Sequence, residues 1–119
     1  MTVDGAVFTF VAVVTLLATG GIVLLMIRGP REGLAKLYHR EADLPAVMAG
    51  RYLCFLVMTV LAVAYGDLMV MLGLQFSFLV AALVDTWIYW RGGHRYGPHL
   101  MAGLASAVAA VLLVCALVT

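Results

Sequence analysis

Residues 46–90 decide the fold, and their sequence is AVMAGRYLCFLVMTVLAVAYGDLMVMLGLQFSFLVAALVDTWIYW. Two apolar runs, 46–65 and 68–90, are separated only by Gly66 and Asp67. Each run has about 20 residues, which at about 1.5 Å per residue is enough to cross a hydrocarbon core of about 30 Å. The runs are continuously apolar rather than alternating, which favours helices over barrel strands. The stretch therefore predicts a tight antiparallel pair of transmembrane helices.

Two further apolar runs, 5–27 and 98–118, flank this pair. The 119-residue chain is 66% hydrophobic and only 11% charged, whereas soluble domains have about 25% charged residues. A soluble protein of this size needs more charge than that to cover its surface. We therefore expect an all-α integral membrane protein, a four-transmembrane-helix bundle that forms a single membrane domain over residues 1–119.

The basic residues all lie in or beside the first and third connections. There are seven: Arg28, Arg31, Lys36, Arg40, Arg51, Arg91 and Arg95. By the positive-inside rule, loops 28–47 and 91–97 face the cytoplasm, and both termini lie outside. Because Arg outnumbers Lys and the chain is rich in Ala, Val, Gly and Leu, the composition is typical of a GC-rich bacterial genome. We expect a multi-pass protein of the bacterial inner (cytoplasmic) membrane.

The first connection contains a stretch of helical character, residues 31–41. Leu34, Leu37 and Tyr38 share one helical face with Glu41, and Pro30 stands where a helix can begin. This pattern predicts a short amphipathic helix on the cytoplasmic membrane surface. The alternative is a solvated loop with a single helical turn.

Arg51 and Asp85 are the charged residues that lie inside the predicted helices. Counted from the turn at Gly66, both lie a few residues inside the cytoplasmic ends of adjacent helices. A lone carboxylate within a membrane is costly, and an arginine on the adjacent helix offsets that cost. The spacing predicts an intramembrane Arg51–Asp85 ion pair, which either fixes the register of the two helices or lines a polar pocket. The alternative is no pair, with Arg51 reaching the lipid headgroups.

Aromatic and histidine side chains gather at the same end of the helices. They form a candidate ligand or lipid pocket: Tyr52, Trp87, Tyr89, Trp90, His94 and His99. The alternative is an interfacial belt that binds no ligand. His94 and His99 are separated by Gly97 and Pro98 and share no helix face, so the sequence predicts neither a metal nor a haem site. No cofactor is predicted, although this pocket would suit a bound lipid, quinone or pigment.

The last predicted helix carries small residues at helical spacing. The expected helix-packing face comprises Ala102, Gly103, Ser106, Ala107 and Ala110. Ala105 and Ala109 repeat the same spacing. Small residues let helix backbones approach closely in lipid, where hydrophobicity does not drive association. We expect one small face to pack inside the protein and the other to contact a protein partner or a second copy.

Two resemblances to known families follow from these features. The size and four-helix plan resemble the small multidrug-resistance transporters, but residues 5–27 lack the membrane-embedded Glu of that family, and the charge bias is one-sided. The chain is also similar to uncharacterised bacterial four-helix membrane proteins of unknown function. That likeness rests on Arg51 after Ala49-Gly50, on Asp85 at the end of the stretch 81–85, and on His99. It implies no activity.

Three functions remain open on the sequence alone. The first is a non-catalytic accessory or scaffold subunit within a larger membrane complex. The second is a small homo-oligomeric transporter or channel that uses Asp85 and Arg51. The third is a binder or enzyme for a lipophilic ligand in the cytoplasmic leaflet. The sequence has no nucleophile–base pair or phosphate loop and no nucleic-acid-binding pattern, so we expect membrane lipid and protein partners rather than catalysis.

Overall fold

A computed structural model describes residues 6, 13, 17 and 21–119 of the chain. The chain divides into two compact units, residues 1–50 and 51–119, which are described separately. All secondary structure in the described residues is helical. Most of the expected first helix, 5–27, lies outside these residues.

In the first unit, residues 21–28 are helical and a second helix, α2 (Pro30–Lys36), follows directly. Gly33 of α2 is buried against the preceding helical residues. A Cβ atom at this position would lie 3.0 Å from the Leu25 carbonyl oxygen and 3.3 Å from Met26 Sδ. The corner between the two helical segments therefore depends on the absence of a side chain at Gly33.

Helix α2 is shorter than the amphipathic helix expected over 31–41. It ends in a Schellman motif, in which His39 N–H donates to Leu34 O at 2.9 Å and Tyr38 N–H donates to Ala35 O at 3.0 Å. Tyr38 has a φ of +60°, the left-handed conformation that stops a helix. The helix therefore ends before residue 41, although the amphipathic pattern of the sequence continues to that residue.

A short 3-10 helix, η1 (Glu41–Asp43), leads into α3 (Leu44–Tyr65). Two ion pairs surround it: Arg31 to Glu41 at 3.2 Å and Arg40 to Asp43 at 3.5 Å. All four side chains are largely exposed, and exposed pairs of this kind contribute little stability.

In the second unit, the end of α3 is joined to α4 (Leu68–Arg91) by the expected tight turn. Gly66 has a φ of +74°, which a glycine adopts at little cost. The Asp67 carboxylate then caps α4, accepting hydrogen bonds from Met69 N–H at 2.8 Å and Val70 N–H at 3.0 Å. Farther from the turn, the rings of Phe55 and Phe78 join α3 to α4, with their centroids 5.4 Å apart.

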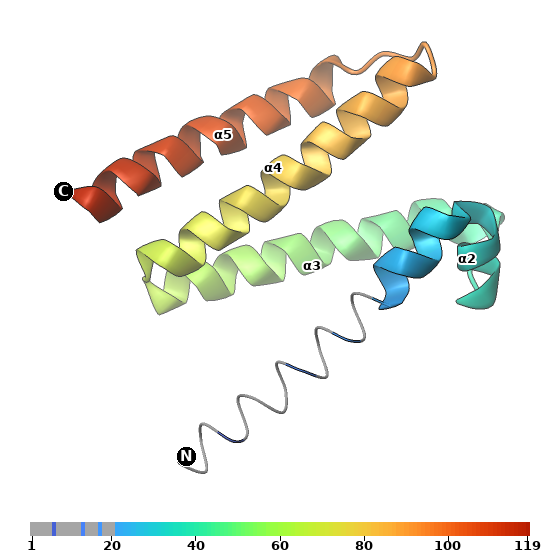
Figure 1. Cartoon of the computed structure of the whole chain (residues 1–119), viewed down its shortest axis with the longest axis horizontal. Helices are drawn as coiled ribbons and strands as arrows, with labels where there is room; N and C mark the ends of the chain where they lie inside the picture. Colours follow the sequence, from blue (N-terminus) through green and yellow to red (C-terminus); the bar gives the residue numbers. More distant parts are fainter. Residues whose placement is uncertain (1–5, 7–12, 14–16, 18–20) are drawn as a thin grey trace. The chain divides into compact units, whose positions relative to one another are not determined.

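Helix α5 (Gly97–Val118) runs back alongside α4, as Figure 1 shows. Among the described elements, α4 and α5 form the one extensive interface between helix backbones. Gly103 and Ser106 of α5 are buried in this interface. A Cβ at Gly103 would lie 3.4 Å from Ala82 Cβ, so the two backbones meet at small residues.

Three helical segments are long and apolar enough to cross a membrane: Glu41–Tyr65, Leu68–Arg91 and Gly97–Val118. Their outward side chains are apolar; Leu61, Phe76 and Leu112 are 60–65% exposed. Such a surface suits lipid rather than water. The fold is that of a helical membrane protein.

Candidate functional site

Helix α4 ends in a second Schellman motif. His94 N–H donates to Tyr89 O at 2.9 Å, and Gly93 N–H donates to Trp90 O at 3.1 Å. Gly93 has a φ of +72°, and no atom lies within 4 Å of where its Cβ would be. Glycine is therefore used here for its backbone conformation and not for lack of space. The chain reverses at once after α4.

Helix α5 starts a few residues later, and His99 lies in its first turn after Gly97 and Pro98. Asp85 lies six residues before the end of α4 at Arg91, or about 9 Å along the helix. Because the connection between the helices is short, the first turn of α5 lies at the same level as Asp85. His99 and Asp85 therefore face each other across the interface between α4 and α5.

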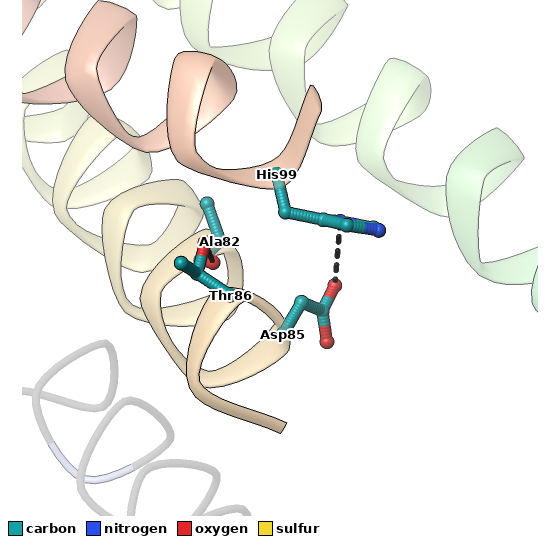
Figure 2. A network of polar contacts seen from close by, with 4 residues as sticks. All are labelled: Ala82, Asp85, Thr86 and His99. Atoms are coloured by element: carbon teal, nitrogen blue, oxygen red, sulfur yellow. Dashed lines mark hydrogen bonds and ion pairs between the residues drawn. The ribbon is translucent and has the colours of Figure 1, made fainter. Parts of the chain in front are cut away.

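Figure 2 shows this contact, in which His99 Nδ1 lies 3.6 Å from Asp85 Oδ2. We call the two residues the Asp85–His99 pair. The distance allows an ion pair when the imidazole is protonated, but it is too long for a direct hydrogen bond. Both side chains are partly exposed, His99 by 30% and Asp85 by 41%. The pair lies at the surface of the helix pair rather than in its interior.

Tyr89 holds the imidazole from one side. Its ring is stacked on that of His99, with centroids 4.7 Å apart and planes 10° apart. The same tyrosine meets His94 edge-on at 6.2 Å. The structure thus brings together three members of the expected aromatic–histidine pocket, Tyr89, His94 and His99, of which His99 contacts Asp85.

The other expected pocket residues have different neighbours. Tyr52 packs edge-on against Phe55 of its own helix, with ring centroids 5.9 Å apart. Trp87 lies under the guanidinium of Arg91, 4.8 Å from ring centroid to Cζ, a cation–π contact typical of a membrane interface. Trp90 is 60% exposed. Three of the six expected residues are therefore grouped around Tyr89, and the contacts of Tyr52 and Trp87 lie elsewhere.

The expected Arg51–Asp85 ion pair is not among the ion pairs formed by the described residues. The Phe55–Phe78 contact sets the register of α3 against α4. Arg51 lies four residues from Phe55, and the matching position on α4 is Ala82, about one turn short of Asp85. Arg51 is exposed, which fits the alternative that its side chain reaches outward.

The expected helix-packing face on α5 is only partly used. Gly103 and Ser106 are buried, Ala107 and Ala110 are half-buried, and Ala102 is exposed. As for metals, no group of three or more His, Cys, Asp or Glu side chains in the described part of the chain is placed to hold an ion.

Comparison of the chain with models of known protein families, with curated proteins and with solved structures finds no match.

The contact between Asp85 and His99 is the feature that sequence reasoning missed. The same counting that suggested Arg51 could have found it, had it been applied across the connection between α4 and α5. That connection is only five residues long, Gly92 to Tyr96, and its two glycines and the following Pro98 indicate a sharp reversal. A sharp reversal places the first turn of the next helix beside the last turns of the one before.

Proposed function

We propose that the protein is a non-catalytic accessory subunit that packs within a larger complex of the bacterial inner membrane. The observation that carries this proposal is the small amount of packing among the described residues of the second unit. Among the described residues, the buried apolar side chains are Ala62, Leu74 and Ala82, at 4%, 9% and 9% exposure, and no large side chain is fully buried. Helices in lipid are held together by such packing, and contacts with another protein would add to it.

The free small face of α5 supports a protein neighbour. Ala102 and Ala105 are exposed and Ala109 is half-buried, while Gly103 and Ser106 are buried against α4. At 3.6 residues per turn, the three alanines form a strip beside the buried face. A helix of another subunit can approach such a strip closely.

The proposed orientation places loops 28–47 and 91–97 in the cytoplasm and both termini outside. It is supported by the seven basic residues, all of which lie in or beside those two loops. The Asp85–His99 pair would then lie on the cytoplasmic side of the membrane.

A transporter or channel is less well supported by the polar groups near mid-membrane. The Thr59 hydroxyl donates to Phe55 O at 2.8 Å, and the Ser77 hydroxyl donates to Gly73 O at 2.9 Å. Both hydroxyl hydrogens are thus used within their own helices rather than offered to a passing solute.

Native mass spectrometry of the tagged protein, gently extracted from its host membranes, tests the accessory role. We expect a protein partner in fixed stoichiometry. Ala105→Phe should reduce the recovered partner severalfold, because the larger side chain keeps the neighbouring helix at a distance.

Val111→Phe is the matched control, because Val111 is 61% exposed and lies about 120° around α5 from Ala105. It should leave the partner's yield unchanged. A protein recovered only as a monomer, or only as copies of itself, would overturn the accessory role.

A further inference from the structure

The Asp85–His99 pair has hydrogen-bonding capacity that the described residues do not use. The two side chains are 3.6 Å apart, and neither forms a hydrogen bond with another described residue. A carboxylate has about four acceptor positions, and an imidazole has a second ring nitrogen. Both groups are partly exposed at the edge of a membrane-spanning helix pair. Unmet polar groups are costly there, so a further polar group at this place would be stabilised.

The pair is also held in position. The stacked ring of Tyr89 fixes the plane of the imidazole. Thr86, next to Asp85, directs its hydroxyl away to Ala82 O at 2.7 Å, as Figure 2 shows, and so does not satisfy the carboxylate. The two polar groups are therefore presented together at the surface of the helix pair.

The charges of the site select the chemistry of a ligand. Asp85 repels an anionic headgroup. Arg91 and Arg95, six and ten residues after Asp85 in the sequence, disfavour a cationic one. A neutral hydroxyl avoids both repulsions, and it can donate to the carboxylate while it accepts from the imidazole. The apolar helix surface around the pair suits a hydrocarbon chain.

We propose that the Asp85–His99 pair binds the hydroxyl headgroup of a neutral amphiphile, with its hydrocarbon part along the apolar surface of the helices. The site is independent of the accessory role and would exist in a protein with or without a protein partner. It requires both the carboxylate and the imidazole.

The protein carries its own reporter for this site. Its two tryptophans, Trp87 and Trp90, lie two and five residues after Asp85 on the same helix. The full-length protein in lipid nanodiscs would be titrated with a nitroxide-labelled long-chain alcohol, which quenches tryptophan fluorescence on close approach. The methyl ether of the same labelled chain is the comparison probe, because it cannot donate a hydrogen bond.

We expect saturable quenching by the alcohol and only weak, non-saturable quenching by the ether. Asp85→Leu and His99→Leu should each weaken binding of the alcohol about tenfold or more, the loss expected for a hydrogen bond to a charged group. Thr86→Val is the matched control and should bind as the unaltered protein does, because its hydroxyl is already bonded within α4. Far-UV circular dichroism would verify that each variant remains helical.

Equal quenching by the alcohol and the ether in the unaltered protein would overturn the proposal, whatever the variants do. The same is true if helical Asp85→Leu and His99→Leu proteins bind the alcohol as tightly as Thr86→Val. Either result would mean that the probe only partitions into the surrounding lipid.

Discussion

At the scale of single residues, the backbone conformations of Tyr38 and Gly93 decide where two helices stop. Both residues occupy the same left-handed position of a Schellman motif, with φ of +60° and +72°. Only one of them is a glycine, and a residue with a side chain pays about 1–2 kcal/mol for this conformation. Introducing glycine at residue 38 and removing it from residue 93 should therefore have opposite effects on helix stability.

Tyr38→Gly should stabilise the end of α2 by about 1 kcal/mol, because it removes the cost of a left-handed tyrosine. The tyrosine side chain is 94% exposed, so little packing is lost. Hydrogen–deuterium exchange at the amides of residues 38 and 39 should slow accordingly. Gly93→Ala should have the opposite effect and speed exchange at residues 93 and 94. Faster exchange in Tyr38→Gly would contradict this account of the helix end.

Gly33→Ala should destabilise the first unit by about 1–3 kcal/mol, because the new methyl group would press on the Leu25 carbonyl at 3.0 Å. Gly50→Ala is the control: no atom lies within 4 Å of its Cβ position, and alanine favours a helix by about 1 kcal/mol. Thermal unfolding in detergent, followed by circular dichroism, compares the two. Equal melting temperatures would show that the corner at Gly33 is not closely packed.

At the scale of the elements, hydropathy located the described helices well. The expected runs 46–65, 68–90 and 98–118 differ from α3, α4 and α5 by at most two residues at either end. Apolar runs of this length are bounded by the polar residues that must leave the membrane, so the sequence marks the ends directly. The end of α2 could not be found in this way, because a single left-handed residue sets it within a continuing amphipathic pattern.

Asp67→Ala should destabilise the start of α4 by about 1 kcal/mol, since two backbone N–H groups lose their acceptor. Asp67→Asn retains a side-chain oxygen and should cost much less. Amide exchange at Met69 and Val70 reports the loss locally. If both variants exchange at the same rate as the unaltered protein, the carboxylate does not cap the helix.

Gly103→Leu should separate α4 from α5 and cost about 1–3 kcal/mol or more, because Ala82 already lies 3.4 Å from the position of a Cβ. Gly73→Leu makes the same change in α4 where nothing lies within 4 Å, and it should be tolerated. Resistance of the purified proteins to thermal aggregation distinguishes them. Comparable losses from both substitutions would mean that the close contact of the two helices is not what stabilises the pair.

At the scale of the whole molecule, the sequence indicated a helical membrane protein. It also indicated the end of the helices where the charged and aromatic side chains gather, but it did not identify the partner of Asp85. Counting residues from one turn gives the depth of a side chain, whereas its partner depends on how closely each pair of helices approaches. Here α5 lies against α4 through small residues, while α3 contacts α4 through the larger rings of Phe55 and Phe78. The closer helix provided the partner, His99.

We propose above all that these helices cross the membrane with the connection between α4 and α5, and hence the Asp85–His99 pair, on the cytoplasmic side. Labelling of single cysteines by a membrane-impermeant maleimide tests it directly. The two free cysteines, Cys54 and Cys115, would first be replaced by serine. Then Thr119→Cys and His94→Cys would be introduced separately and labelled in intact spheroplasts. We expect rapid labelling at residue 119 and labelling at residue 94 only after permeabilisation. Labelling at residue 94 in intact spheroplasts would contradict it.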